Sequence, residues 1–332
     1  MLRVGVIGVG HLGRHHARVY SSLEGCELVG VHDADAGAAR SVAEEFGALA
    51  FADAGDLVSA VDAASIAVPT TFHHEVGSLC LERGVHVLIE KPIASTVEEA
   101  SALVERARGG NLVLQVGHIE RFNPAVRAAA EVLTRPMFVE AHRLGVFVPR
   151  GTDVPVVLDL MIHDIDLILS TVGARVETVD AVGVPVLSPN VDIANARLTF
   201  EGGCVANVTA SRVSREKVRK IRFFQPDAYV TIDSITPRAQ VFRRREVSPE
   251  TMRRIATGEI EGGLEDIVEH QELRLDDAEP LALELASFVS AVTTGSRPVV
   301  DGEDGLRALE VALEVLRQMG ETDRSDTGTP AT

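Results

Sequence analysis

The apolar and polar positions of this chain follow one pattern up to about residue 117 and another pattern after it. In the first part, short apolar runs rich in β-branched residues alternate with longer segments of helical periodicity. Such runs are typical of strands covered on both faces, and their alternation with helices predicts a doubly wound, mainly parallel sheet. The predicted strands span 2–7, 26–31, 48–51, 63–68, 85–89 and 111–116, and the predicted helices span 14–22, 36–46, 54–60, 72–83 and 97–108.

After residue 117, apolar residues alternate with polar ones over longer segments, and few helical segments intervene. This alternation is typical of an antiparallel sheet. The turn signal Glu201-Gly202-Gly203 separates two of the segments and predicts a hairpin. The predicted strands span 138–148, 176–186, 193–200, 204–211, 218–224 and 239–247, and the predicted helices span 123–133, 157–171, 280–293 and 305–319.

Composition and charge narrow the function classes. The net charge of −17 argues against nucleic acid or an anionic membrane surface as a partner. No apolar stretch has the length that spans a membrane, and the first strand begins at residue 2, which leaves no room for a signal peptide. The three cysteines, Cys26, Cys80 and Cys204, share no metal-like spacing. We therefore expect buried free thiols and a cytoplasmic protein.

A glycine-rich turn joins the first predicted strand to the first helix. Gly8, Gly10 and Gly13 stand in the G-x-G-x-x-G spacing, with His11 and Leu12 inside the turn. The strand–turn–helix context makes this otherwise weak motif a strong indication of the Rossmann fold. The first glycine permits the tight turn, the second lets the backbone approach a pyrophosphate, and the third lets helix and strand pack closely. We expect these five residues to contact a dinucleotide.

Asp33 stands at the end of the second predicted strand, twenty residues after Gly13. This is about the spacing expected for a carboxylate that binds the ribose hydroxyls of an adenosine. The residues after it, Ala34-Asp35-Ala36, include no Lys or Arg that would accept a 2′-phosphate. The sequence therefore favours NAD over NADP as the cofactor.

These signals predict an α/β fold in two domains. We expect a Rossmann domain with a doubly wound parallel sheet over residues 1–120, and an α+β domain with a large, mainly antiparallel sheet over 121–320. The second domain would bind substrate and form the oligomer, and the polar tail 321–332 is predicted to be disordered. The cleft between two such domains is the usual place for an active site. Broad exposed sheets often pair across subunits, so we expect a homodimer or homotetramer.

Two polar clusters follow strands of the first domain. Glu90-Lys91-Pro92 comes directly after the fifth strand, and Pro69, Thr70 and His73 follow the fourth. Ligands of open α/β sheets bind beyond the carboxyl ends of the strands, so these side chains should lie near the cofactor. By position alone, a solvated lysine at the end of a strand explains Lys91 equally well.

The predicted helix over 157–171 carries Asp159 and His163 among apolar neighbours. Positions i and i+4 lie on one helix face, so Asp159 could orient His163, and a histidine near neutrality is a suitable general base. A purely structural Asp–His pair is the alternative. A metal site formed with Asp166 is disfavoured, because dehydrogenation by a nucleotide cofactor needs no metal.

A third polar segment, Gly117 to Pro124, begins where the sixth strand ends. It contains His118, Arg121 and Asn123, which we expect to contact substrate. The fork of Arg121 suits a phosphate or carboxylate. A salt bridge between the domains would explain this arginine equally well.

The combination of Gly8-Val9-Gly10-His11-Leu12-Gly13, Glu90-Lys91-Pro92 and Asp159-x-x-x-His163 resembles the Gfo/Idh/MocA oxidoreductase family. The resemblance covers the chain to about Gly320. It implies that Lys91, Asp159 and His163 form the catalytic group. Some members have a tyrosine in place of the histidine, but neither Tyr20 nor Tyr229 is in register, so the chain resembles the histidine branch.

Within this family, three segments resemble members that oxidise the 3-hydroxyl of UDP-N-acetylglucosamine: 116–125, 221–230 and 300–306. The resemblance implies NAD-dependent oxidation of a secondary hydroxyl of a sugar or nucleotide sugar, with hydride transfer to the nicotinamide. One alternative is an inositol or free-sugar dehydrogenase of the same family. Another is a dinucleotide-sensing protein without chemistry, against which the presence of Lys91, Asp159 and His163 speaks.

Overall fold

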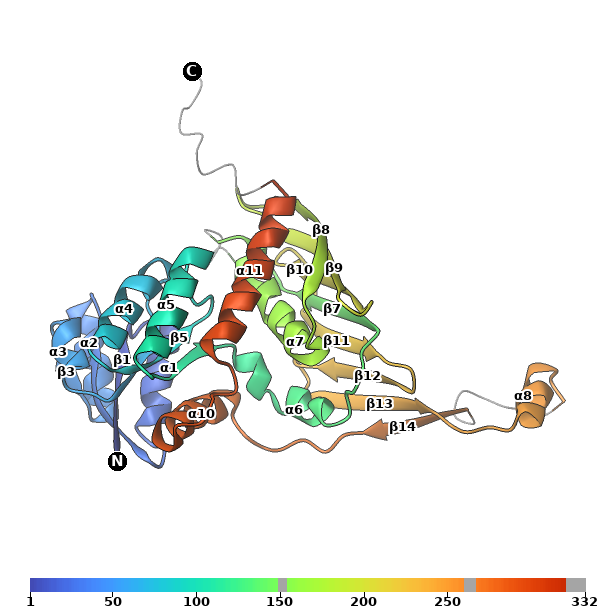
Figure 1. Cartoon of the computed structure of the whole chain (residues 1–332), viewed down its shortest axis with the longest axis horizontal. Helices are drawn as coiled ribbons and strands as arrows, with labels where there is room; N and C mark the ends of the chain where they lie inside the picture. Colours follow the sequence, from blue (N-terminus) through green and yellow to red (C-terminus); the bar gives the residue numbers. More distant parts are fainter. Residues whose placement is uncertain (149–153, 260–266, 321–332) are drawn as a thin grey trace, which may run out of the picture. The chain divides into compact units, whose positions relative to one another are not determined.

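The computed structural model describes residues 1–148, 154–259 and 267–320 (Figure 1). The chain forms two compact units. The first comprises Met1–Phe122 and Ala278–Val311, and the second comprises Asn123–Asp277 and Ala312–Thr332. The tail predicted to be disordered, 321–332, lies outside the described residues. Within the described ranges, no helix combines the length and the hydropathy that crossing a membrane requires.

The first unit contains a six-stranded parallel sheet with the order β3-β2-β1-β4-β5-β6. This is the strand order of the doubly wound Rossmann fold, and it confirms the predicted fold class. The order reverses between β1 and β4, which places the switch point beside the glycine-rich turn. The strands are β1 (Leu2–Ile7), β2 (Cys26–His32), β3 (Leu49–Phe51), β4 (Ala63–Ile66), β5 (His86–Glu90) and β6 (Leu114–Gly117).

Helices connect these strands, and capping side chains define where several of them begin. Asp35, Asp53 and Thr96 accept hydrogen bonds from backbone amides at the starts of α2, α3 and α5, which satisfies donors that a helix leaves unpaired. The elements are α1 (His11–Tyr20), α2 (Ala36–Phe46), α3 (Ala54–Val58), the short 3₁₀ turn η1 (Thr70–Phe72), α4 (His73–Glu82), α5 (Val97–Gly109) and the 3₁₀ turn η2 (Ile119–Phe122).

A helix from late in the chain completes the core of the first unit. Leu281, Leu285 and Phe288 of α10 (Pro280–Thr294) pack in one hydrophobic cluster with Val4 and Tyr20, and Figure 1 shows α10 beside α1. The compact units therefore differ from the predicted division at residue 121. Periodicity identifies α10 as a helix, but it does not show which core its apolar face joins. The last helix, α11, spans Gly302–Gln318.

The second unit contains an eight-stranded sheet with the order β14-β13-β12-β11-β7-β10-β9-β8. All neighbours are antiparallel except β7 and β10, which confirms the predicted, mainly antiparallel sheet. The strands are β7 (Phe138–Leu144), β8 (Val176–Val184), β9 (Ile193–Phe200), β10 (Val205–Ser211), β11 (Val218–Phe224), β12 (Ala228–Asp233), β13 (Arg238–Arg244) and β14 (Val268–Glu272). Its helices are α6 (Pro124–Ala130), the π-helical turn η3 (Val157–Met161), α7 (Ile162–Val172) and α8 (Pro249–Ala256).

The two faces of this sheet differ in their side chains. On one face, Val139, Phe223, Val230 and Val241 are buried. On the opposite face, five rings at paired positions of β7, β11, β12, β13 and β14 stack in a row, with centroids 4.7 to 5.6 Å apart. We call this row the aromatic ladder; its members are Phe138, Phe224, Tyr229, Phe242 and His270.

Candidate active site

The glycine-rich turn has the geometry that its sequence predicts. Gly8 has φ +85°, a conformation that side chains disfavour. A Cβ on Gly13 would lie 1.8 Å from the carbonyl oxygen of Gly8, so this position must be glycine for α1 to pack against the turn. A Cβ on Gly10 would meet nothing within 4 Å. The backbone at Gly10 therefore faces open space, as the approach of a pyrophosphate requires.

The start of α1 also fits an anionic group. Its N-cap residue, Gly10, offers no side-chain acceptor, and its first turn contains no acidic residue. Backbone amides at a helix N-terminus need acceptors, and the helix dipole favours negative charge there. His11 and Leu12, which we predicted as cofactor contacts, are exposed in this first turn. These features fit a cofactor that carries phosphates.

Asp33 lies beside the glycine-rich turn, as its predicted role requires. Its Oδ2 accepts a hydrogen bond from the Val9 amide at 2.7 Å, and its Oδ1 accepts one from the Asp35 amide at 2.9 Å. A carboxylate has about four acceptor positions, so these two bonds leave room for two ribose hydroxyls. The side chain is half-buried, with the orientation fixed by the backbone.

The predicted group after β4 divides into an accessible part and a buried part. Pro69 is exposed and Thr70 half-buried, but the His73 ring is buried. Its Nδ1 lies 2.8 Å from the carbonyl oxygen of Pro92, and its Nε2 lies 2.9 Å from that of Val68. Burial lowers the pKa of His73, although these two carbonyl groups oppose the shift. The ring thus holds the turn after β4 to the turn after β5.

Glu90 and Lys91 also differ in burial. Lys91 is half-buried at the carboxyl end of β5, whereas the Glu90 carboxylate is buried and lies 3.0 Å from Nε2 of His16 on α1. The Lys91 amide donates to the other oxygen of Glu90 at 3.3 Å. Burial raises the pKa of Glu90, but the hydrogen bond from His16 and the charge of Lys91 outweigh it, so the pKa lies below its ordinary value. Glu90 is therefore ionised at neutral pH.

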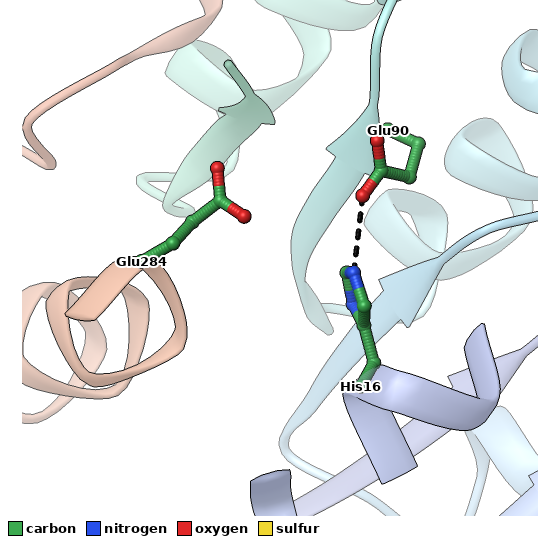
Figure 2. Close-up of side chains that lie close together, drawn as sticks. All are labelled: His16, Glu90 and Glu284. Atoms are coloured by element: carbon green, nitrogen blue, oxygen red, sulfur yellow. Dashed lines mark hydrogen bonds and ion pairs between the residues drawn. The ribbon is translucent and has the colours of Figure 1, made fainter. Parts of the chain in front are cut away.

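One group among the described residues brings three metal-ligating side chains together. Potential ligand atoms of His16, Glu90 and Glu284 all lie within 4.8 Å of one another, and all three side chains are buried. Figure 2 shows the Glu284 carboxylate pointing from α10 toward the pair formed by His16 and Glu90. His16 and Glu90 face each other at hydrogen-bond distance, which indicates a hydrogen-bonded cluster. Sequence reasoning missed His16 and Glu284, because their meeting depends on how α1 and α10 pack.

In the segment after β6, Arg121 of the segment 116–125 lies near Asp304 of the segment 300–306. The nearest guanidinium nitrogen of Arg121 lies 4.0 Å from Oδ1 of Asp304, and both side chains are largely buried. This contact lies inside the first unit. His118 is buried, and Asn123 caps α6 through a hydrogen bond from the Ala125 amide to its Oδ1.

Asp159 and His163 lie in the second unit on either side of a change in helix type. Asp159 belongs to η3, where the Ile162 amide bonds to the carbonyl of Val157 five residues earlier. His163 belongs to the first turn of α7. We predicted one regular helix over 157–171, which is wrong for its first turn. Such π-helical turns are frequent at functional sites. Both side chains are half-buried.

An ion pair that the sequence did not predict fixes α7 to the sheet. Nε and Nη2 of Arg143 on β7 each donate to one oxygen of Asp164 at 2.9 Å, and both side chains are buried. Asp164 directly follows His163 in the chain. The predicted site residues are thus divided between the units: Asn123, Asp159 and His163 belong to the second, and all the others to the first.

Comparisons with known proteins place both parts of the chain in one family. Residues 2–118 match the family described as "Oxidoreductase family, NAD-binding Rossmann fold", and residues 97–228 match the GFO/IDH/MocA C-terminal domain. The chain is 40% identical over 317 residues to UDP-N-acetylglucosamine 3-dehydrogenase of Acidithiobacillus ferrooxidans, which covers 95% of this chain and 96% of that protein. A solved structure of that enzyme aligns with a TM-score of 0.87 and 37% identity over 96% of this chain and 98% of the other. The chain is 26% identical to scyllo-inositol 2-dehydrogenase (NAD(+)) of Bacillus subtilis, over 94% of this chain and 92% of that one.

Proposed function

The chain belongs to the Gfo/Idh/MocA oxidoreductase family, and we propose that it oxidises the 3-hydroxyl of UDP-N-acetylglucosamine. It is an NAD-dependent dehydrogenase that acts on CH–OH groups. The observation that carries the choice of substrate is the 40% identity to UDP-N-acetylglucosamine 3-dehydrogenase along nearly the whole of both chains. Inositol dehydrogenases that match over a comparable length are 23% to 28% identical.

Three side chains of this protein would carry out the reaction. The His163 imidazole accepts the proton of the substrate hydroxyl, and Asp159 orients the ring and stabilises its charged form. The Lys91 ammonium donates a hydrogen bond to the substrate oxygen and stabilises the negative charge that develops there. Bound NAD supplies the hydride acceptor. These roles agree with the chemistry of each group: a half-buried imidazole, a nearby carboxylate in the chain, and a cation beyond the end of β5.

The proposed contacts to the cofactor follow from the turn geometry. The Gly10 backbone and the first amides of α1 would hold the pyrophosphate, and Asp33 would accept the ribose hydroxyls. The cofactor-contacting residues that we propose are Gly8, Gly10, His11, Leu12, Gly13, Asp33, Pro69, Thr70 and Lys91. His73 and Glu90 are buried, so we propose that they support the cofactor-contacting residues through the contacts described above and do not touch the cofactor themselves.

The proposed nucleotide-sugar substrate also gives Arg121 a function. A UDP-sugar contains a diphosphate, and a guanidinium fork suits it. Asp304 stands beside Arg121 and also pairs with Arg297 and Arg307, so the aspartate is shared among three cations. We propose that Arg121 binds the diphosphate and that His118 and Asn123 shape the same region.

The experiment that tests the function is a substrate panel. The purified protein is incubated with NAD and either UDP-N-acetylglucosamine, UDP-glucose, free N-acetylglucosamine, myo-inositol or scyllo-inositol, and reduced cofactor is measured by absorbance. We expect turnover with UDP-N-acetylglucosamine and none above background with the inositols. Lys91→Met should keep NAD binding nearly intact, because most of the cofactor contacts remain, and should lose most turnover. Faster oxidation of an inositol, with no dependence on Arg121, would replace this function by the polyol alternative.

We also propose that the protein is a homo-oligomer that pairs through the face of the sheet with the aromatic ladder. Phe138, Phe224, Tyr229 and Phe242 are half-buried on that face, whereas their neighbours on the opposite face are fully buried. Stacked rings offer large apolar area at low entropic cost. Light scattering after size-exclusion chromatography should give a dimer or a tetramer, and Phe242→Asp should lower the mass. A monomeric wild-type protein would contradict this assignment.

We propose a reducing compartment, the cytoplasm, as the location. Cys26, Cys80 and Cys204 are buried free thiols, and burial raises the pKa of each. Thiolates are the reactive form, so these cysteines should resist modification in the folded protein. Cell fractionation with a marker enzyme tests the location.

A further inference from the structure

Glu90 is enclosed by groups that hold its carboxylate in one place. A hydrogen bond from His16 reaches one oxygen at 3.0 Å, and the Lys91 amide approaches the other at 3.3 Å. A Cβ on Gly117 would lie only 2.9 Å from Oε2 and 3.0 Å from Cδ, so the glycine leaves the space that the carboxylate occupies. Contacts from α1, from the end of β5 and from β6 thus fix the position of the buried, negatively charged Glu90 carboxylate.

The Glu90 carboxylate lies next to Lys91, which follows it in the chain. The two residues are neighbours at the end of β5. Burial raises the pKa of Glu90, the hydrogen bond and charge of His16 lower it, and the charge of Lys91 adds to this lowering. Because that interaction is mutual, the carboxylate in turn favours the charged form of the lysine. Among the described residues, the other titratable groups near Glu90 include His16 on α1, His73 on α4 and Glu284 on α10, and the buried Tyr20 hydroxyl interacts with Glu284.

We propose that Glu90 and His16 are positioning residues, which hold Lys91 in place and keep it protonated for its work on the substrate oxygen. His16 acts through Glu90: its Nε2–H fixes the carboxylate, and the carboxylate fixes the backbone and the charge of Lys91. Glu90 would then contribute to the chemical step and not to cofactor affinity. This inference rests on the proposed function for the role of Lys91, but the pairing itself can be measured without any substrate.

The chain offers a direct measurement, because it contains only three lysines: Lys91, Lys217 and Lys220. Reductive methylation with ¹³C-formaldehyde keeps each amine titratable and gives one resolved NMR signal per lysine. The signal of Lys91 is assigned by its loss in Lys91→Arg. We expect Glu90→Gln to move the titration midpoint of Lys91 down by about one pH unit, since it removes the charge and keeps the shape. The signals of Lys217 and Lys220 should stay where they are.

Kinetics of the same variants test the positioning role. Glu90→Gln should lower kcat about tenfold or more, with the KM for NAD nearly unchanged. Gln at position 16 can still donate to Glu90 from its amide, so His16→Gln should retain more of kcat than His16→Leu. The double variant His16→Leu with Glu90→Gln should lose little more than Glu90→Gln alone, because the two residues act in series.

Tyr20→Phe is the matched control. It removes a buried hydroxyl from the same helix, which forms a hydrogen bond with the Ser65 hydroxyl at 2.9 Å, and it changes no charge near Lys91. An unchanged Lys91 midpoint in folded Glu90→Gln would overturn the proposal, whatever the substrate is. An equal loss of kcat in Tyr20→Phe would also overturn it, because the loss would then come from disturbing the core. If Glu90→Gln does not fold, the comparison of His16→Gln with His16→Leu decides. A wild-type protein that oxidises no sugar would defeat the proposed function and leave the titration result standing.

Discussion

Arg143 on β7 and Asp164 on α7 form a two-pronged ion pair, with both N–O distances 2.9 Å, inside the second unit. Asp164 follows the proposed base, His163, so the pair fixes the turn of helix on which that imidazole stands. Two parallel hydrogen bonds define an orientation as well as a distance. The sequence shows Asp164 only as a polar residue on an apolar helix, and its partner lies twenty-one residues away.

Removing one member of this pair should destabilise the folded protein. Asp164→Ala leaves the Arg143 guanidinium buried beside an empty space, and breaking a buried pair costs about 3–5 kcal/mol. Urea denaturation should show this loss in the free energy of unfolding. The matched control is Glu140→Gln, which breaks the more exposed pair of Glu140 with Arg222 and should cost under about 1 kcal/mol. Equal effects of the two substitutions would show that the buried pair does not hold α7.

Two glycines of the cofactor turn should respond differently to alanine. Gly13→Ala places a Cβ 1.8 Å from a backbone oxygen, so the turn must deform, and we expect a loss of several kcal/mol in stability together with NAD binding. Gly10→Ala meets no atom of the folded protein within 4 Å and should fold with a nearly unchanged Tm. Its NAD affinity should nevertheless fall, because the methyl group occupies the space that the pyrophosphate needs.

Calorimetry and thermal unfolding of both variants give the result. A Gly10→Ala protein that binds NAD as well as the wild type would show that the pyrophosphate does not approach this part of the turn.

Asp33 should set the choice between NAD and NADP. A 2′-phosphate would meet the negative charge of Asp33, and Ala34 offers no cation in compensation. Replacing Asp33 with Ser and Ala34 with Arg should therefore shift the ratio of kcat/KM values toward NADP. The variant also loses the hydrogen bonds that the Val9 and Asp35 amides donate, so a decrease in stability of about 1 kcal/mol should accompany it. A wild-type protein that already prefers NADP would refute the role of Asp33.

How far the sequence predicts the fold depends on how local each signal is. The alternation of apolar runs and helices predicts the six parallel strands, because each run needs only its own residues to be recognised. The strands β12 and β14 and the helix α8 are missing from the prediction. Tyr229 and Thr231 face the ladder side of β12 while Val230 and Ile232 are buried, so the alternation exists but is only six residues long.

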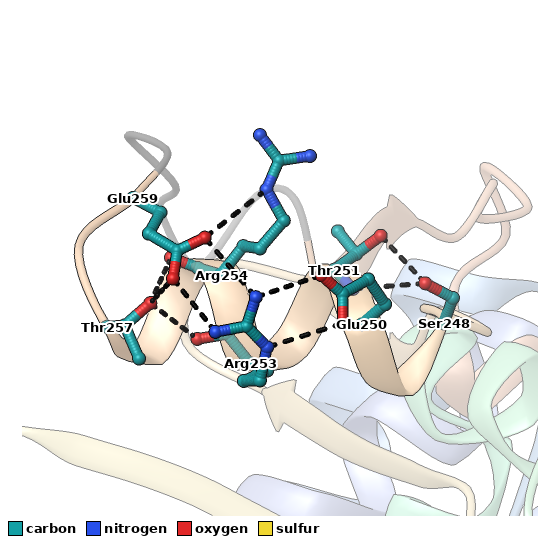
Figure 3. Close-up of polar contacts among 7 residues, drawn as sticks. All are labelled: Ser248, Glu250, Thr251, Arg253, Arg254, Thr257 and Glu259. Atoms are coloured by element: carbon teal, nitrogen blue, oxygen red, sulfur yellow. Dashed lines mark hydrogen bonds and ion pairs between the residues drawn. The ribbon is translucent and has the colours of Figure 1, made fainter.

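The sequence of α8 contains a helix-start signal that does not depend on hydrophobic periodicity. Ser248 precedes Pro249, and its hydroxyl accepts a hydrogen bond from the Thr251 amide, a combination that marks a helix start. Figure 3 shows Arg253 joined to both Glu250 and Glu259, so charged pairs stabilise a helix that has no fully buried face among its described side chains. Hydrophobic periodicity cannot detect such a helix, but capping residues can.

The site could be predicted only where its chemistry is continuous in the chain. Lys91 stands out because it follows a strand and precedes a proline, and Asp33 because of its spacing from the glycines. His16 is one of three histidines in α1, and nothing in the sequence distinguishes it from His11 or His15. Its importance arises from a contact with Glu90, seventy-four residues away. Such positioning contacts depend on packing, which a single sequence does not reveal.

Stability at low pH should depend on Asp192. Burial raises the pKa of this carboxylate, but hydrogen bonds from the Ser188 hydroxyl and from the amides of Val186, Leu187 and Ser188 outweigh this effect and hold the pKa at about 2. Because the folded state binds the proton less readily than the unfolded state, the stabilisation is complete above about pH 4 and is lost as the pH falls toward 2. Asp192→Asn should cost about 2 kcal/mol at pH 7 and much less near pH 2.

Chemical denaturation of Asp192→Asn and wild type across this range measures the difference. A gap that stays constant from pH 7 to pH 2 would show that the loop depends on the shape of the carboxylate and not on its charge.

The last prediction concerns the base. A protonated imidazole cannot accept the hydroxyl proton, so kcat/KM for sugar oxidation should rise with pH through one ionisation near neutrality if His163 is the base. Asp159→Asn removes a charge that favours the imidazolium, so it should move the midpoint of this rise to lower pH and lower the rate through poorer orientation. His163→Ala should lose the rise altogether while it keeps its fold and its NAD affinity. His163→Gln is the control for ring volume, since its amide has no comparable ionisation. If His163→Ala keeps both its rate and its pH profile, Lys91 is the remaining candidate for the base, and Asp159 and His163 serve only to hold the turn where η3 becomes α7.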